Sequence, residues 1–383
     1  MFISRLALDH FRSWEHCLLD FTPGVTILQG ANGLGKTNIV EAIEFLATGS
    51  SHRASSSAPL VERGFDKATI RANVNGETAG HVTTYEATIR AKGANRARVN
   101  GGPSLYLRDI IGDIPLVAFT PDDQRLVSAD PSERRRFLDQ TASLLIRGYA
   151  DTLQRFTHIA KQRATLLKQL NTTDGFDSSR DTALSGLEIW TGQYIDVGLQ
   201  LTRDRMAVIE RLQQPFRELV HDLAGPDEDA SLDYEPSFDE IFQGDGAAAL
   251  ISEHFQRLYA GEVARGRNLI GPQRDDLLIM LNAFPAREFA SNGEMWMLGL
   301  ALKMAVYRLL EERFGTQPIV VLDDVFAQLD DARRAQIMHF AAAQHQVFIT
   351  VAAAGDIPSD SSFAHAHVID VAALRDTQDE GTL

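Results

Sequence analysis

Gly30–Thr37 is the segment of this sequence whose residue spacing is most specific for a chemical function. Its sequence, GANGLGKT, fits the pattern G-x-x-x-x-G-K-[ST]. In that pattern backbone N–H groups surround a β-phosphate, the lysine reaches the β- and γ-phosphates, and the hydroxyl binds Mg²⁺. We therefore expect a nucleoside triphosphate here, with Lys36 catalytic and Thr37 a metal ligand. The predicted binding residues are Gly30, Ala31, Asn32, Gly33, Leu34, Gly35, Lys36 and Thr37.

Such a loop needs a strand before it and a helix after it, and the sequence predicts both. Val25–Leu28 is a short apolar run typical of a buried strand, while Ile39, Ile43 and Leu46 recur at helical spacing. The start of that helix adds positive partial charge where a phosphate would lie. This context favours a phosphate-binding loop over a glycine-rich turn that merely precedes a helix.

Two acidic residues near the other end of the chain supply the second chemical feature. Ile319–Leu322 is wholly apolar, as a central parallel strand often is, and Asp323 and Asp324 follow it. Because ligands bind at the carboxyl ends of parallel strands, we expect this strand to neighbour the strand of the phosphate loop. Asp323 would then hold Mg²⁺, and Asp324 would polarise the attacking water.

A long insertion separates these motifs, and its first part has the pattern of β structure. From Asn73 to Gly102 the sequence has short alternating runs with turn signals at Asn75-Gly76 and Asn100–Gly102. These features predict an antiparallel β lobe.

The second part of the insertion, after Pro131, is predicted to be helical. Apolar and aromatic residues recur there in alternating steps of four and three, on either side of the polar stretch Asn171–Asp181. The pattern predicts an antiparallel helical hairpin with limbs of roughly 30 Å. Arg163 and Arg205 interrupt its two apolar seams. They leave open whether the hairpin packs as core or projects as an arm that contacts DNA or a partner. The seam positions are Tyr149, Leu153, Phe156, Ala160, Leu167 and Leu170, then Trp190, Tyr194, Val197, Leu201, Val208 and Leu212.

Ser291–Glu294, with the sequence SNGE, allows two compatible interpretations. Ser291 followed by Glu294 fits a capping box at the start of a helix whose apolar face runs from Leu298 to Leu309. The form S-x-G-[EQ] is also that of the ABC-type signature. In that class Ser291 and Gly293 would bind the γ-phosphate held by an opposite subunit.

The composition limits where a polyanion could bind. The formal net charge is −15, which by itself argues against a nucleic-acid binder, so any DNA-binding surface must be local. The best basic candidates are Arg90, Lys92, Arg96 and Arg98, and a second cluster at Arg134, Arg135 and Arg136. Each cluster is equally compatible with a solvated surface.

The only cysteine is Cys17, and no stretch has the long apolar run of a membrane span. We therefore expect a cytoplasmic protein without a membrane partner.

Beyond these motifs, the sequence resembles the RecF family of bacterial recombination mediators, which are SMC-like ABC-type ATPases. The resemblance covers almost the whole chain, and PSERRRFLD and GPQRDD are not general features of ABC-type ATPases. The matching segments are LALDHFRSW, GANGLGKTNIVEAIEFLATGSSHR, VAFTPDDQRLV, PSERRRFLD, GPQRDDL, SNGE and VVLDDVFAQLD.

The resemblance implies an α/β fold: an ABC-type P-loop ATPase head with an antiparallel β lobe and an inserted α-helical arm domain. Residues 1–125 and 268–383 would form the two-lobed head, and residues 126–267 the arm. ATP would join two heads, each nucleotide lying between Gly30–Thr37 of one copy and Ser291–Glu294 of the other. Asp330 would belong to the D-loop of this site, across the dimer seam.

The resemblance also implies a function. The ATP-dependent homodimer would bind duplex DNA and junctions of single- and double-stranded DNA at gaps. With RecR and RecO it would promote the loading of RecA at gaps during DNA repair. It would be a weak, DNA-stimulated ATPase whose slow hydrolysis of ATP, with Mg²⁺, separates the dimer.

Some positions depart from the family or class pattern. Thr350 stands where ABC transporters usually have a histidine, which puts γ-phosphate sensing by histidine in doubt. Gln273 replaces an expected histidine and Gln124 an expected leucine, so Gln124 is not assigned to the Q-loop. Met295 and Trp296 replace polar residues after the signature. The apolar pair is compatible with a dimer interface or with packing on the head.

The main alternative is the ATPase subunit of an ABC transporter. It shares the phosphate loop, the signature and the acidic strand, but it has no obvious place for an insertion such as Glu133–Arg267. An ABC-fused nuclease would need a further acidic metal-binding domain, for which the residues after Asp330 are too few. A long-armed SMC protein would need seams of many more heptads.

Overall fold

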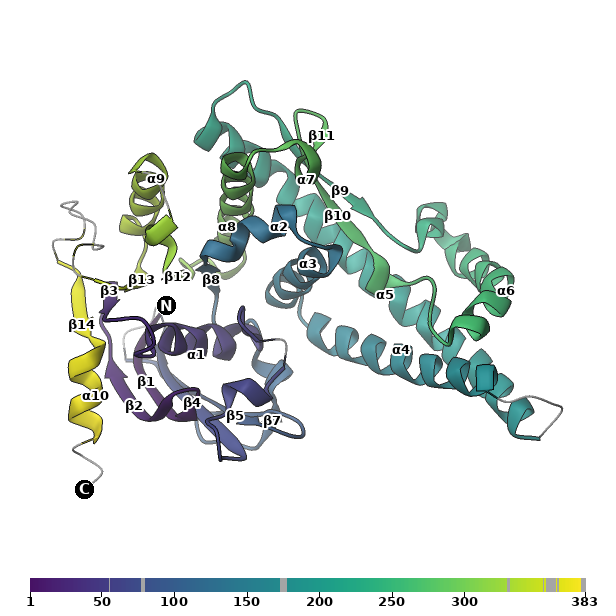
Figure 1. The fold of residues 1–383 in the computed structure, drawn as a ribbon, viewed down its shortest axis with the longest axis horizontal. Coiled ribbons are helices and arrows are strands. Elements are labelled where there is room, and N and C mark those ends of the chain that lie inside the picture. The colour runs from purple at the N-terminus through teal and green to yellow at the C-terminus, as the bar shows by residue number, and fades with distance from the viewer. Residues whose placement is uncertain are drawn as a thin grey trace. The chain divides into compact units, whose positions relative to one another are not determined.

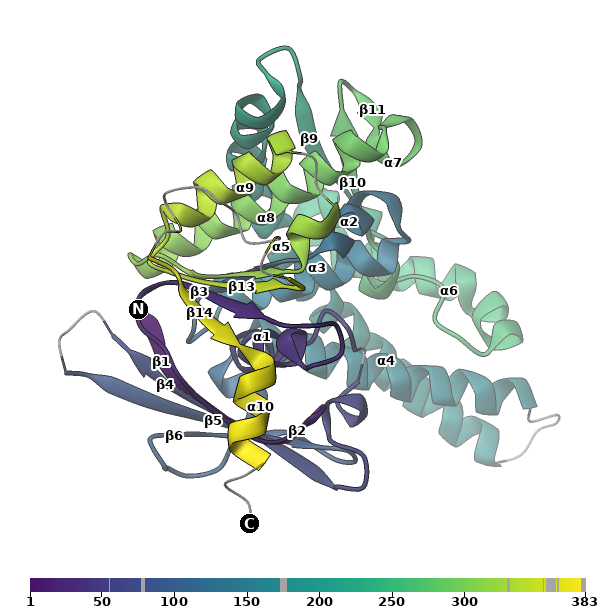
Figure 2. The same cartoon turned by 60° about the vertical axis from the view of Figure 1, so that its left-hand side comes forward.

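The computed structural model describes residues 1–54, 56–76, 80–172, 178–328, 331–353, 355, 363 and 365–379. By its internal contacts the chain divides into two compact units (Figures 1 and 2). The head unit consists of Met1–Gln124 and Trp296–Leu383, and the arm unit is Arg125–Met295.

A parallel sheet forms the first layer of the head unit. In the described residues it has five strands in the order β14-β3-β13-β12-β8, all paired in parallel. They are β14 (His367–Asp370), β3 (Gly24–Gln29), β13 (Gln346–Val351), β12 (Ile319–Asp323) and β8 (Leu116–Phe119). The predicted strands at Val25–Leu28 and Ile319–Leu322 are thereby confirmed.

An antiparallel sheet forms the second layer of the head unit. Within the described ranges it has six strands in the order β2-β1-β4-β5-β6-β7. They are β2 (Trp14–Asp20), β1 (Phe2–Phe11), β4 (Lys67–Asn75), β5 (Val82–Arg90), β6 (Arg96–Val99) and β7 (Leu105–Tyr106). The antiparallel lobe predicted from Asn73 to Gly102 is confirmed. Strands β1 and β2 join it from the N-terminal end of the chain, and β7 follows after the predicted range.

Helix α1 (Lys36–Thr48) packs between the two sheets of the head unit and contacts strands of both. Ile39, Ile43 and Leu46, the predicted apolar face, are all buried in the shared core. On the parallel sheet, Phe119 of β8 packs on Phe340 of α9 (Asp331–Ala342), and Tyr307 of α8 (Asn292–Phe314) packs on the same ring. The chain reaches α10 (Val371–Asp379) directly after β14. Strand β3 lies between β14 and β13, and helix α1 lies between the two sheets. Both ends of the loop that joins β3 to α1 are therefore held in place.

The arm unit is built mainly of helices. Figure 1 shows α4 (Tyr149–Thr172) and α5 (Ser178–Ala224) side by side, which confirms the predicted helical hairpin. The second limb is not the predicted 30 Å. Helix α5 has 47 residues, or about 70 Å at 1.5 Å per residue, because it continues through Pro215 without ending. The other elements are α2 (Arg125–Ser128), α3 (Pro131–Leu145), α6 (Ala247–Arg265), α7 (Ala286–Phe289), β9 (Ala230–Glu235), β10 (Asp276–Leu281) and β11 (Phe284–Pro285).

The two arginines on the hairpin seams are buried and ion-paired inside the arm unit. Arg163 Nη2 lies 2.5 Å from Glu262 Oε2 on α6. Arg205 Nη2 lies 2.9 Å from Asp139 Oδ1 on α3, and its Nη1 lies 3.0 Å from Asp275 Oδ2. Buried charges require such partners. The seam arginines therefore belong to the packing of the arm unit.

Residues 268–295 are grouped differently by sequence and by contacts. The sequence division placed them with the head, whereas the contacts place them in the arm unit. The physical reason is that β10 pairs with β9 along its whole length, from Asp276 with Glu235 to Leu281 with Ala230. The division into a functional head and arm remains a prediction.

Across the described ranges, no helix combines the length and the apolar character that crossing a membrane requires.

Candidate nucleotide-binding site

The phosphate loop runs from the end of β3 to the first residue of α1. Lys36 opens the helix, is 4% exposed, and donates from Nζ to Gly30 O at 2.7 Å and to Ala31 O at 3.2 Å. The two carbonyls hold the ammonium group over the loop. The predicted residues Gly30–Thr37 form the loop and the helix start that directly follow β3, as a phosphate-binding loop requires.

Gly35 is a glycine for two reasons that the geometry makes explicit. Its φ of +98° is rare for residues with a side chain, and a Cβ there would lie 2.7 Å from Trp14 Nε1. The indole N–H donates to Gly35 O at 3.1 Å. Trp14 therefore packs against the loop, and its ring leaves no room for a side chain at position 35.

Arg375 of α10 holds the same loop from the far end of the chain. Its Nε donates to Leu34 O at 2.7 Å, and its Nη2 donates to Ser13 O at 3.0 Å. The guanidinium lies 4.4 Å from the centroid of the Trp14 ring. Sequence analysis did not identify Arg375, because neither its spacing nor a motif connects it with the loop. Trp14 lay inside a matching segment, but nothing indicated its role.

On the metal side of the site, Thr37 and Asp323 meet. Thr37 Oγ1 donates to Asp323 Oδ1 at 3.1 Å. A hydroxyl and a carboxylate are the hard oxygen ligands that Mg²⁺ prefers, so this donor set fits the predicted metal. The strand arrangement differs from the prediction. β12 does not neighbour β3, because β13 lies between them and places Thr350 level with Asp323 and Leu28.

Thr350 joins the two acidic residues. Its hydroxyl oxygen lies 2.7 Å from Asp323 Oδ1 and 3.3 Å from Asp324 Oδ1, and it accepts the backbone N–H of Asp324 at 2.9 Å. Asp324 has a φ of +51°, a conformation that aspartate and asparagine tolerate better than most residues. This left-handed turn directs the chain away from β12 just after Asp323. The position that carries a histidine in ABC transporters thus carries a hydroxyl that contacts both acids.

His52 is a further neighbour of the metal ligand that sequence analysis did not assign. Its Nε2 lies 3.4 Å from Asp323 Oδ2, and its Nδ1 lies 2.5 Å from Glu44 Oε2. Burial acts to lower the pKa of His52, but the hydrogen bonds and charges of Asp323 and Glu44 outweigh it and raise the pKa to about 10. The available signal was the match of Ser51–Arg53 to the family pattern.

The residues on either side of His52 attach to Glu41 of α1. This glutamate is fully buried and accepts from Arg12 Nε at 2.9 Å, from Arg53 Nη1 at 3.4 Å and from the Ser51 hydroxyl. Arg53 also donates to Asn38 Oδ1 at 2.9 Å. The segment Ser51–Arg53 is therefore anchored on the helix that carries the phosphate loop.

The signature segment lies in the arm unit and forms the predicted capping box. Ser291 N donates to Glu294 Oε2 at 2.7 Å, and Glu294 N donates to Ser291 Oγ at 3.3 Å. Hydrogen bonds from the Ser291 side chain and backbone hold the pKa of Glu294 below 4.5. Ser291 is exposed and Gly293 is half-buried, so the start of α8 is accessible. Asp330, the predicted D-loop residue, lies outside the described residues.

Two of the departing residues have structural partners. Gln273 Oε1 accepts from the Tyr194 hydroxyl at 2.7 Å, and its Nε2 donates to Ile270 O at 3.1 Å, both in the arm unit. In the head unit the Arg333 guanidinium lies 5.6 Å from the centroid of the half-buried Trp296 ring. Gln124 is the last residue of the turn Pro121–Gln124. The carbonyl oxygen of Asp123 in this turn lies so close to Gly299 of α8 that a Cβ added to Gly299 would be only 2.7 Å from it. Gly299 thus permits close contact between α8 and this turn.

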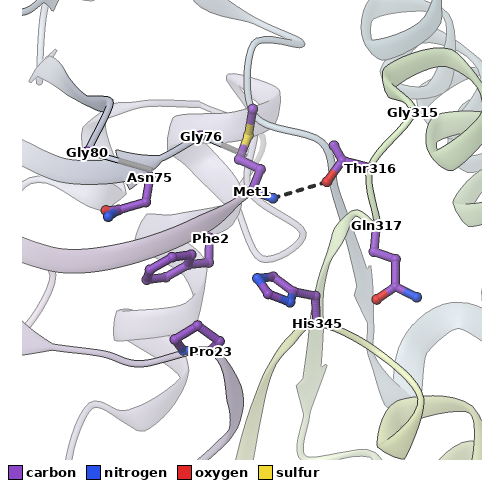
Figure 3. Close-up of a pocket in the computed structure, with 10 residues that line it drawn as sticks. All are labelled: Met1, Phe2, Pro23, Asn75, Gly76, Gly80, Gly315, Thr316, Gln317 and His345. Carbon is purple, nitrogen blue, oxygen red and sulfur yellow. Dashed lines mark hydrogen bonds between the residues drawn. The ribbon is translucent and has the colours of Figure 1, made fainter. Parts of the chain in front are cut away.

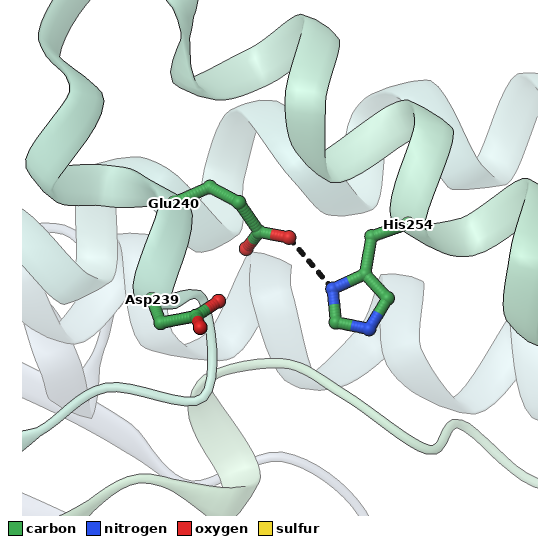
Figure 4. Close-up of side chains that lie close together, drawn as sticks. All are labelled: Asp239, Glu240 and His254. Atoms are coloured by element: carbon green, nitrogen blue, oxygen red, sulfur yellow. Dashed lines mark hydrogen bonds and ion pairs between the residues drawn. The ribbon is translucent and has the colours of Figure 1, made fainter.

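Two other features are separate from the phosphate loop. A pocket of about 590 Å³ in the head unit is lined by residues that include Phe2, Asn75, Thr316 and His345 (Figure 3). Among the described residues, none of those predicted to bind nucleotide lines it. In the arm unit His254 Nδ1 lies 2.6 Å from Glu240 Oε1, with Asp239 nearby (Figure 4). This hydrogen bond joins the turn Asp239–Gly246 to α6.

Comparison with known proteins gives a consistent result over nearly the full length. The family described as RecF/RecN/SMC N terminal domain matches residues 2–362. The DNA replication and repair protein RecF of Bifidobacterium adolescentis is 64% identical over 377 residues, which are 98% of this chain and 92% of that protein. The protein of the same name from Bifidobacterium longum subsp. infantis is 63% identical over 374 residues, 98% of this chain and 90% of that protein.

A solved structure described as "Structure of the recombination mediator protein RecF-ATPrS in RecFOR pathway" is 26% identical in sequence. It superimposes with a TM-score of 0.83 and covers 94% of this chain and 94% of that chain. The parallel sheet, the phosphate loop and the second, antiparallel sheet are those of an SMC-like ABC-type ATPase head. The chain belongs to the RecF family.

Proposed function

We propose that this protein is an ATP-dependent recombination mediator in DNA repair, which binds DNA and uses ATP hydrolysis as a switch. The observation that carries the proposal is the meeting of Thr37 Oγ1 and Asp323 Oδ1 at 3.1 Å, beside the buried Lys36 of the phosphate loop. Its relatives are named DNA replication and repair proteins, and the solved relative is described as a recombination mediator with a bound ATP analogue.

In this proposal ATP binds at Gly30–Thr37. Lys36 contacts the β- and γ-phosphates, and Thr37 and Asp323 hold Mg²⁺, which neutralises phosphate charge when bound. Asp324 orients the attacking water and accepts its proton. Asp324 has a left-handed backbone conformation, and its N–H donates to the Thr350 hydroxyl. These two features position the Asp324 carboxylate at the end of β12.

The signature segment completes the site of a second copy. Ser291 and Gly293 open α8 at an accessible helix start, where backbone N–H groups and the helix dipole attract a phosphate. Two copies would then bind two ATP molecules between them, with Asp330 at the seam. Hydrolysis removes the γ-phosphate that joins the copies, so the homodimer separates.

The dimer would bind duplex DNA and junctions of single- and double-stranded DNA in the cytoplasm. With RecR and RecO it would promote RecA loading at gaps, and DNA would stimulate a weak ATPase activity. The head would comprise residues 1–125 and 268–383 and the arm residues 126–267. A transporter subunit is not favoured, because the family match spans the chain and Thr350 occupies the position of the switch histidine.

Sedimentation velocity with and without ATP tests this function, in the presence of gapped and fully duplex DNA. We expect an ATP-dependent dimer whose DNA binding rises with ATP. Ser291→Arg should leave the monomer folded and able to bind ATP but unable to dimerise. Ser185→Arg, at an exposed serine of α5, is the matched control and should dimerise normally. ATP-independent association, or no DNA binding by the dimer, would contradict the proposal.

A further inference from the structure

One edge of the antiparallel sheet of the head unit is strongly basic although the protein is acidic. The segment from Ala87 to Arg108 contains no aspartate or glutamate, in a chain with a net charge of −15. It covers the end of β5, all of β6 and β7, and the following turn. We name its cationic residues the basic edge: Arg90, Lys92, Arg96, Arg98 and Arg108.

Tyr106 organises two members of the basic edge. The guanidinium carbons of Arg96 and Arg108 each lie 4.1 Å from the centroid of its ring. Arg96 is also the direct register partner of Tyr106 between β6 and β7. A guanidinium stacked on an aromatic ring is held in place by that ring. The edge is therefore partly preorganised for a ligand with several negative charges.

The other members of the basic edge face solvent. Arg98 and Lys92 are exposed, and Ala97 between Arg96 and Arg98 is buried, so these two arginines share the solvent face of β6. In the described part of the chain no carboxylate forms an ion pair with Lys92 or Arg98. The register partner of Arg98 is Glu86, but Glu86 is paired with Arg71 at 2.7 Å. Lys92 and Arg98 therefore carry charges that the described carboxylates do not pair.

The second basic cluster of the sequence is used differently. Arg134 is 3% exposed and pairs with Asp276 at 2.7 Å, while Arg135 donates to Asp275 O at 2.7 Å. Arg136 lies 4.0 Å from Glu133. These arginines stabilise the arm unit. Of the two clusters found by composition, the structure leaves the basic edge accessible.

We propose that the basic edge binds the phosphate backbone of duplex DNA, which rests on the proposed function and assigns it a surface. The guanidinium carbons of Arg96 and Arg108 both lie 4.1 Å from the centroid of the Tyr106 ring, so an unpaired base would have to compete with them to stack on this ring. Contacts from arginine and lysine to phosphates position a protein on the duplex and carry no sequence information directly. Because the net charge of −15 repels DNA, removing a few of these cations should weaken DNA binding strongly.

The test is duplex binding by fluorescence anisotropy, with ATP, over a series of salt concentrations. The double variant Lys92→Ala, Arg98→Ala should lower the slope of log K against log salt by about two and weaken binding about tenfold or more at moderate salt. Arg5→Ala is the matched control, because Arg5 is an exposed arginine of β1, next to the opposite edge strand β2. It should bind as the unsubstituted protein does.

Tyr106 supplies a second measurement that does not remove a charge. Tyr106→Ala should weaken duplex binding several-fold, whereas Tyr106→Phe, which keeps the ring against Arg96 and Arg108, should bind normally. Duplex binding and salt slope unchanged in the double variant would overturn the inference, and so would a loss confined to single-stranded DNA. If the unsubstituted protein with ATP fails to bind duplex DNA, the proposed function fails instead.

Discussion

The hydroxyl oxygen of Thr350 lies 2.7 Å from Asp323 Oδ1, on the strand next to β12. The same oxygen accepts the backbone N–H of Asp324 at 2.9 Å. One side chain thus fixes the carboxylate proposed to bind Mg²⁺ and the turn that carries the proposed catalytic carboxylate. The positions of Asp323 and Asp324 therefore depend on the Thr350 hydroxyl.

Thr350→Val should impair hydrolysis while ATP still binds. Valine has nearly the same shape, but it leaves the Asp324 N–H without its acceptor, so we expect a loss of about 1–3 kcal/mol in the free energy of unfolding. The measurement is chemical denaturation together with ATP turnover. Thr350→Ser keeps the hydroxyl and should restore most of the turnover. Equal turnover in the valine variant and the unsubstituted protein would contradict this role.

Asp324→Asn should keep the fold and ATP binding but lower hydrolysis by about 100-fold or more, the range expected for loss of a catalytic base. Asparagine tolerates the φ of +51° at this position, so a folding defect is not expected. ATP-bound dimers should accumulate and be visible by sedimentation. Hydrolysis at the full rate would refute the assignment of the base.

Arg375→Ala should weaken ATP binding about tenfold, or about 1.4 kcal/mol, because the phosphate loop loses the donor to Leu34 O and the cation above Trp14. Isothermal titration with an ATP analogue measures the effect. Arg375→Lys keeps the charge without the planar fork and should lie between the two. An unchanged affinity in Arg375→Ala would show that α10 does not position the loop.

The capping box should make the start of α8 sensitive to acid. Since hydrogen bonds from Ser291 lower the pKa of Glu294 below 4.5, the stabilisation is complete above that pH and is lost as the pH falls through the lowered pKa. An NMR titration of the Glu294 carboxyl group measures it, and Ser291→Ala should move the pKa back toward 4.5. The same pKa in both proteins would contradict the capping interaction.

The residues that sequence could predict are those whose spacing is set by local structure. The phosphate loop, the apolar strand before Asp323 and the capping box each occupy one short segment, so their patterns suffice. The helical hairpin was predicted for the same reason, but the length of α5 was not. The predicted seam ends at Leu212, and Pro215 lies within a helix that tertiary packing continues to Ala224.

The residues that sequence could not predict act across long separations in the chain. Arg375 meets Leu34, His52 meets Asp323, and β13 enters the sheet between β3 and β12. No periodicity in one segment encodes these contacts. In the sequence Thr350 stands out only as a departure from an expected histidine, because its hydrogen bonds to Asp323 and Asp324 depend on the order of the strands. The ion-pair partners of the seam arginines, Glu262 and Asp275, likewise lie outside the hairpin, so the hairpin sequence alone does not identify them.

The central claim is that each ATP site combines the phosphate loop of one copy with the signature segment of another. Lys36→Ala removes the loop function and Ser291→Arg blocks the signature, so neither variant alone can form an intact site. A mixture of the two contains heterodimers with one intact site, made of the Ser291→Arg loop and the Lys36→Ala signature.

Measuring ATP-dependent energy transfer between copies labelled separately tests this directly. We predict little signal for each variant alone and a clear ATP-dependent signal for the mixture. A mixture that behaves as the sum of its two inactive components would contradict a site shared between copies.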